Sequence, residues 1–178
     1  MKYLIDTHIL IWLAVTPEKV PKHILEIIEN PQNDIFISTV SLWEIAIKLS
    51  IRKLDLQGLT IDDLVQICDE QNIKVVQLPV SAIKKYRLIP LKENHKDSFN
   101  RALIALCISD GYVFLSHDGK LGQYEQDGLS FISWHNLRKT STKDNISPEI
   151  KAMILKMNKL SSEEKQILFD MLDMHVKK

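Results

Sequence analysis

The sequence lacks the features that mark membrane and disulfide-stabilised proteins. It has no apolar run long enough to cross a bilayer, and Met1 leads directly into an apolar segment rather than into a signal peptide. We therefore expect a cytoplasmic protein with no membrane contact. Only two cysteines are present, Cys68 and Cys107, and both lie in apolar helical patterns. They are expected to be buried thiols in a reducing compartment.

An excess of charge of either sign is also absent, since 23 Lys and Arg residues balance 23 Asp and Glu residues. This balance excludes a global positive field, so any contact with nucleic acid must come from local basic groups. The chain has no internal repeat or low-complexity segment. What is present, 45% hydrophobic and 26% charged residues in 178, is typical of a globular protein with one main domain.

Short apolar runs alternate with longer amphipathic stretches through most of the chain. The runs predict buried strands at 3–5, 35–37, 73–78, 112–115 and 130–133, with helices of about ten residues between them. This alternation favours an α/β fold of three layers, in which helices flank a central parallel sheet. We assign residues 1–138 to this domain. Residues 139–178 are predicted to form a linker and two amphipathic helices, which must pack on this domain, on a second copy or on a partner protein.

Four acidic residues occupy related positions in this pattern. Asp6 and Asp118 follow strands, Glu44 lies in an early turn of a helix, and Asp97 precedes a long helix. Each position also has a simpler interpretation, such as a helix cap for Asp6 or a surface site for Glu44, and Thr7 is expected to cap the first helix. Because strand ends of a parallel sheet share one edge, the four acids are expected to meet there. Clustered carboxylates require a cation, and Mg²⁺ suits oxygen ligands.

Four segments carry a more specific signature: LIDTHILIW from residue 4, STVSLWEIAIKLSIRKLDL from residue 38, HKDSFNRALIAL from residue 95 and YVFLSHDGKLGQY from residue 112. They resemble the PIN-domain ribonucleases, and in particular the VapC-type toxins of bacterial toxin–antitoxin pairs. The resemblance implies a PIN-like fold and a Mg²⁺- or Mn²⁺-dependent endoribonuclease that cleaves structured RNA. It also implies an antitoxin partner, a homodimer, and acidic site residues at Asp6, Glu44 and Asp118, with Ser116 supporting the last of these.

One position departs from the family pattern. Where relatives usually carry an Asp at the start of the long helix, this chain has Asn100. An amide oxygen can bind a metal but brings no charge and cannot act as a base. We predict that Asp97, one helical turn earlier, is the third catalytic and metal-binding acid, with Asn100 assisting. The alternative is a weakened site in a protein that binds RNA or a partner without cleaving.

Contacts to RNA are predicted at two further places. Arg101 follows Asn100 and is expected to contact the scissile phosphate. A local basic stretch is expected to follow the RNA backbone, and it consists of Lys84, Lys85, Arg87, Lys92 and Lys96. The Trp43 ring is expected to lie in the core rather than to stack on a base.

Overall fold

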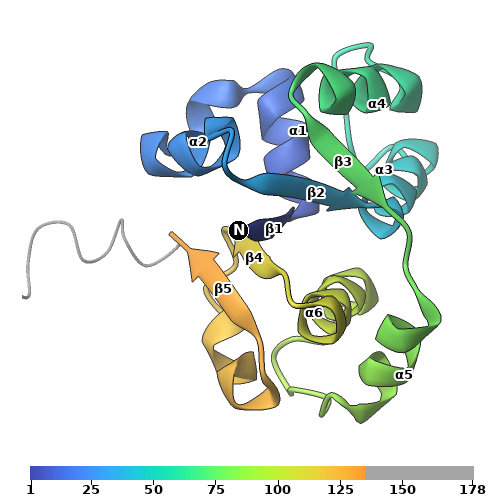
Figure 1. Cartoon of the computed structure of the whole chain (residues 1–178). Helices are drawn as coiled ribbons and strands as arrows, with labels where there is room; N and C mark the ends of the chain where they lie inside the picture. The colour runs from blue at the N-terminus through green and yellow to red at the C-terminus, as the bar shows by residue number, and fades with distance from the viewer. Residues whose placement is uncertain (135–178) are drawn as a thin grey trace, which may run out of the picture. The chain divides into compact units, whose positions relative to one another are not determined.

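The computed structural model describes residues 1–134, which form alternating strands and helices (Figure 1). The strands in this range are β1 (Lys2–Ile5), β2 (Asp34–Ser38), β3 (Ile73–Val76), β4 (Val113–Ser116) and β5 (Ser130–Ser133). The helices are α1 (Thr7–Val15), α2 (Lys22–Glu29), α3 (Thr39–Ser50), α4 (Ile61–Glu70), α5 (Val80–Leu88) and α6 (Ser98–Asp110). Two short 3₁₀ helices, η1 (Pro17–Lys19) and η2 (Leu121–Asp127), complete the described part.

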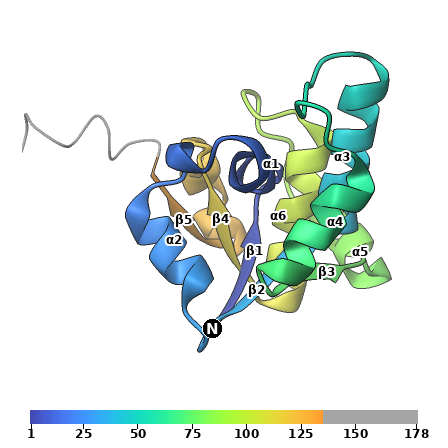
Figure 2. The same ribbon diagram turned by 90° about the horizontal axis from the view of Figure 1, so that it is seen from above.

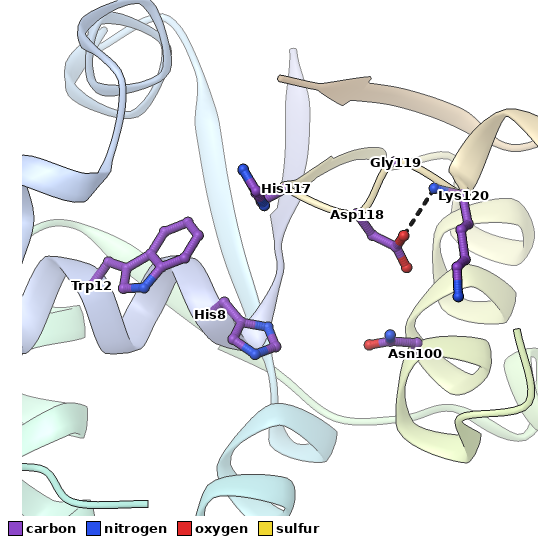
Figure 3. A pocket seen from close by; sticks show the side chains of 7 residues that line it. All are labelled: His8, Trp12, Asn100, His117, Asp118, Gly119 and Lys120. Carbon is purple, nitrogen blue, oxygen red and sulfur yellow. Dashed lines mark hydrogen bonds between the residues drawn. The ribbon is translucent and has the colours of Figure 1, made fainter. Parts of the chain in front are cut away.

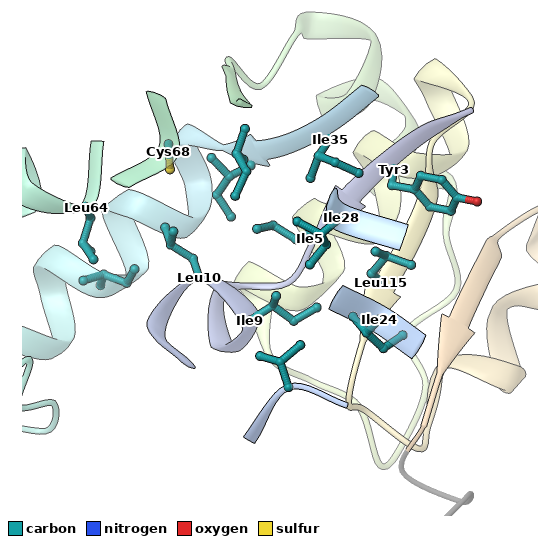
Figure 4. Packing of buried hydrophobic residues seen from close by; sticks show 14 of the residues in the cluster. Tyr3, Ile5, Ile9, Leu10, Ile24, Ile28, Ile35, Leu64, Cys68 and Leu115 are labelled. Atoms are coloured by element: carbon teal, nitrogen blue, oxygen red, sulfur yellow. The ribbon is translucent and has the colours of Figure 1, made fainter. Parts of the chain in front are cut away.

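The strands form one sheet in the order β3-β2-β1-β4-β5, and every neighbouring pair is parallel. β1 is the central strand, and its side chains alternate between two apolar layers. Tyr3 and Ile5 pack with residues of α1, α2 and α4 (Figure 4), whereas Leu4 packs with residues of α5 and α6. Helices therefore cover both faces of the sheet (Figure 2), and the predicted three-layer α/β fold is confirmed.

Local signals in the sequence set most helix ends. Thr60 and Asp63 form a reciprocal capping box at the start of α4, and Ser38 caps α3 by accepting the Val40 amide at 3.1 Å. Gly111 ends α6 at a φ of 72°, a left-handed conformation that costs glycine little. The prediction for α1 was wrong by one residue, because Asp6 rather than Thr7 is the cap. Thr7 instead turns its hydroxyl into the interior.

Burial differs from the prediction at Trp43. Its side chain is 63% exposed, although it was expected in the core, and its ring packs edge-on against Phe99 with centroids 5.5 Å apart. The two cysteines are buried as predicted, and desolvation raises the pKa of Cys68 to about 11. The predicted domain boundary and the C-terminal helices lie outside the described residues.

No helix in residues 1–134 combines the length and hydrophobicity needed to span a bilayer.

Candidate active site

Asp6 and Asp118 lie at the ends of the neighbouring strands β1 and β4. The Asp6 amide donates to the carbonyl of Leu115 at 2.9 Å, so the parallel pairing carries Asp6 to the carboxyl edge of the sheet. The Ser116 hydroxyl donates a short hydrogen bond to the Asp6 carboxylate and accepts the Asp118 amide at 3.1 Å. Ser116 thus connects the carboxylate of Asp6 with the backbone of Asp118, and its predicted role in supporting the Asp118 acid stays a prediction.

Glu44 reaches the same edge from the second turn of α3. Its residue is only 4% exposed, so the surface interpretation of this position is excluded. The Thr7 hydroxyl donates to Oε2 at 2.7 Å, and the Lys48 ammonium lies 2.6 Å from Oε1. Both oxygens of this buried carboxylate therefore have partners, which offset the cost of removing the charge from water.

Asp118 is held by a histidine that the sequence prediction did not include among the site residues. His95 is 4% exposed, and its Nε2 lies 2.8 Å from Oδ2 of Asp118, while its Nδ1 lies 2.8 Å from the Tyr124 hydroxyl. Because an ionised carboxylate only accepts, Nε2 carries the proton, and in the neutral ring Tyr124 donates to Nδ1. The bond from His95 holds the pKa of Asp118 below its usual value. The sequence signal for His95 is its place in the same family segment as Asn100.

His8 is the basic partner of Asp6. Its Nδ1 lies 3.5 Å from Oδ1 of Asp6, and its backbone amide donates to the same oxygen at 3.3 Å. The side-chain bond to Asp6 raises the pKa of His8 despite partial burial. Each of the three acids Asp6, Glu44 and Asp118 therefore lies beside one basic side chain.

A pocket of about 470 Å³ opens beside these groups (Figure 3), lined by His8, Trp12, Asn100, His117, Asp118, Gly119 and Lys120. Figure 3 shows Trp12 and His8 on one side, and Asn100 and Lys120 on the other. Asp97 does not line this pocket. Its exposed side chain caps α6 by accepting the Asn100 amide at 2.8 Å. Asn100 is therefore the residue of the two that faces the pocket, and an acidic role for Asp97 stays a prediction.

The predicted RNA contacts lie away from this pocket. The Arg101 guanidinium donates to the Ile89 carbonyl at 3.0 Å and stacks 4.5 Å above the Tyr86 ring. Lys92 pairs with Asp127 at 3.0 Å. Lys84, Lys85 and Arg87 belong to α5, and the exposed Lys96 directly precedes the cap of α6. None of the six lines the pocket, and their contacts with RNA stay predictions.

The donor chemistry of the site suits a hard divalent cation, because the available ligands are carboxylate, amide and hydroxyl oxygens. The spacing of these ligands, however, does not form a full metal-binding cluster. Within residues 1–134, no three His, Cys, Asp or Glu side chains are grouped closely enough to hold a metal ion. Asp6 and Asp118 are the residues that would hold such a cation, because Ser116 connects the Asp6 carboxylate with the Asp118 backbone. Two carboxylates are enough for Mg²⁺, which commonly binds one or two carboxylates in proteins and keeps several waters.

The fold and the site together define an α/β protein with acidic groups at the carboxyl edge of a parallel sheet, the usual place for ligands in such sheets. The sequence matches the PIN domain family over residues 3–126. The chain therefore belongs to the PIN domain family, and the predicted resemblance is confirmed at this level. No curated protein sequence matches the chain.

The solved structures that share this fold include two VapBC complexes. One is VapBC2 from Rickettsia felis bound to a promoter DNA fragment, with 12% identity, a TM-score of 0.52, and coverage of 75% of this chain and 98% of that chain. The other is VapBC-1 from nontypeable Haemophilus influenzae, with 18% identity, a TM-score of 0.52, and coverage of 76% and 99%. At these identities the similarity shows the fold alone.

Proposed function

We propose that this protein is a Mg²⁺- or Mn²⁺-dependent endoribonuclease and the toxin of a toxin–antitoxin pair, as in the VapC-type toxins that its four segments resemble. One observation carries the proposal. Asp6 and Asp118 follow adjacent strands, and the Ser116 hydroxyl connects the Asp6 carboxylate with the backbone amide of Asp118. Asp118 lines a pocket whose wall also includes His8, the basic partner of Asp6, together with Asn100 and Lys120. A phosphodiester held in this pocket would lie next to the Asp118 carboxylate, on the side of the sheet edge that also carries Asp6.

The residues of the chain have distinct roles in this proposal. Asp6 and Asp118 would hold the cation, which when bound supplies charge for the phosphoryl oxygen and acidifies a water. Glu44, kept in place by Thr7 and Lys48, would orient the attacking water. His95 sets the direction of the Asp118 carboxylate, and Asn100 donates or accepts a hydrogen bond at the pocket wall without adding charge.

An antitoxin and a second copy of the chain are the proposed protein partners. The two solved structures described above are VapBC complexes. The apolar side chains of Val80, Ile83 and Leu88 on α5 are exposed, so this helix has surface available for a protein contact.

The test uses the variant Asp6→Asn, which removes one charge at nearly constant volume. Wild-type protein should cleave structured RNA with Mg²⁺ or Mn²⁺, lose activity in EDTA, and regain it on metal addition. Asp6→Asn should lower the rate by about 10²-fold or more, in the range of losing a major electrostatic contribution. Cleavage by Asp6→Asn at the wild-type rate would refute the proposed site.

The second candidate function is a binding module without cleavage, and Asn100 is the observation that favours it. A pocket that lacks the usual acid at this position has one negative charge fewer for a metal. The variant Asn100→Asp separates the two functions. Cleavage that begins only in Asn100→Asp would identify the natural protein as a binding module.

A further inference from the structure

A second hollow continues from the candidate active site along α1. It encloses about 410 Å³, and it shares His8 and Trp12 with the pocket beside Asp118. Its walls come from α1, η1, the end of α3 and the loop that follows. A polymer strand that leaves the pocket past Trp12 would therefore enter this hollow, which we call the α1 groove.

Basic side chains from separate elements meet at the α1 groove. Lys19 comes from η1, Lys48 from α3, and Lys53 from the loop after α3. Lys48 forms an ion pair with Glu44. Lys19 and Lys53, in contrast, are exposed and form no ion pair within residues 1–134. Asp55 is the one acid on the groove wall, and its carboxylate accepts the Gln57 amide at 2.8 Å. In a chain without net charge, this is a local positive surface.

The Trp12 ring lines both the α1 groove and the pocket beside Asp118. The Trp12 ring contacts His117 edge-on with centroids 5.6 Å apart, and Trp134 with centroids 6.3 Å apart. These contacts hold Trp12 in one place while it lines both hollows. A basic groove next to a fixed aromatic ring is the combination that binds single-stranded nucleic acid, because lysines contact phosphates and rings stack on bases.

We propose that the α1 groove binds the backbone of a single RNA strand that runs from the active site past Trp12 to Lys19 and Lys53. The proposal rests on the proposed ribonuclease function and names the path of its substrate. It differs from the path predicted along α5, because Lys84 and Arg87 line neither the pocket nor the groove.

The test compares two double variants of the full chain. Lys19→Gln/Lys53→Gln removes two charges from the groove, and Lys84→Gln/Arg87→Gln removes two exposed charges from α5. Binding of a short fluorescent single-stranded RNA is measured in EDTA over a series of salt concentrations. The groove variant should bind more weakly, and the slope of log affinity against log salt should fall by about 0.7 for each lost contact. The α5 variant should keep the wild-type slope.

The outcomes separate this proposal from the proposed function. An unchanged slope in the groove variant, or a larger change in the α5 variant, overturns the groove path even if the protein cleaves RNA. If the wild-type protein binds RNA through the groove but never cleaves it, the proposed RNA path holds and the proposed nuclease activity is refuted. A groove variant with normal RNA binding that no longer binds an antitoxin would assign the groove to a protein instead. Matching thermal melts confirm that both variants are folded.

Discussion

At the scale of single residues, the acids of the candidate site are compensated within the fold. His8 accompanies Asp6, Lys48 accompanies Glu44, and His95 accompanies Asp118. Carboxylates that share a site repel each other, and this repulsion normally raises one of their pKa values. Here the basic partners remove much of the repulsion, and the pKa of Asp118 is lowered instead. These basic partners therefore help to stabilise the three carboxylates in the folded protein.

The two nitrogens of His95 can be tested separately. Glutamine places its amide nitrogen near the position of Nε2, whereas asparagine places its amide near Nδ1. We expect His95→Gln to keep the bond to Asp118 and most of the Mn²⁺ affinity, and His95→Asn to lose the bond and weaken Mn²⁺ binding several-fold. Each variant should lose about 1–3 kcal/mol of stability from the unpaired buried groups. Mn²⁺ binding followed by electron paramagnetic resonance provides a readout besides activity.

Equal Mn²⁺ affinity in the two variants would contradict this role. Tyr124→Phe is the matched control, because it removes only the hydroxyl next to Nδ1 and leaves the bond between His95 and Asp118 in place. Tyr124→Phe should lower the free energy of unfolding and leave the Mn²⁺ affinity close to that of the wild type.

At the scale of elements, the start of α6 determines which side chain faces the pocket. Asp97 is the cap and lies just outside the helix, whereas Asn100 is in its first turn and lines the pocket. A cap side chain must fold back onto the first amides of its own helix. The bond from the Asn100 amide to Asp97 therefore competes with any contact that Asp97 would make across the pocket.

Two substitutions of Asp97 separate the cap from a catalytic acid. Asparagine caps helices about as well as aspartate, although it carries no charge. Alanine has no charge and cannot cap the helix. If Asp97 acts as a cap, Asp97→Asn should keep both stability and activity, and Asp97→Ala should lose about 1 kcal/mol in chemical denaturation. Asn100→Ala should lower activity more than Asp97→Asn. Complete loss of activity in a stable Asp97→Asn would restore the prediction that Asp97 is the third acid.

At the scale of the whole molecule, the site connects segments that are far apart along the chain. Asp6 lies between β1 and α1, Asp118 lies in the connection after β4, and His95 precedes α6. The pair formed by His95 and Asp118 thus joins the segment before α6 to the connection after β4. This pair contributes to stability only while Asp118 is ionised.

The pH dependence of unfolding tests this contribution. Because the folded pKa of Asp118 is lowered, its contribution is present above the unfolded pKa of about 3.9 and is lost as pH falls through the folded value. We expect Asp118→Asn to lower the free energy of unfolding by about 1 kcal/mol at neutral pH. The difference from wild type should shrink as pH falls below about 4. Urea unfolding from pH 2 to pH 7 measures the free energy of unfolding of the wild type and of Asp118→Asn. A difference that stays constant with pH would contradict the contribution assigned to the ionised Asp118.

Much of the fold follows from local patterns in the sequence. Short runs of three to six residues identified the five strands of residues 1–134, and the signals at Thr60 and Gly111 marked helix ends. These features are predictable because backbone conformation and capping depend on residues within one or two turns. The placement of Asp6 and Asp118 at one edge also followed, since parallel strands present their carboxyl ends together.

The partners of these acids were decided only by the tertiary structure. Ser116 meets Asp6 across 110 positions of sequence, and His95 meets Asp118 across 23. The α1 groove likewise joins Lys19 and Lys53 from different elements. Which face of a helix is buried depends on the neighbours that the sheet order brings to it. For this reason the local sequence indicated which residues carry charge, and the packing of the sheet and helices determined which of them meet.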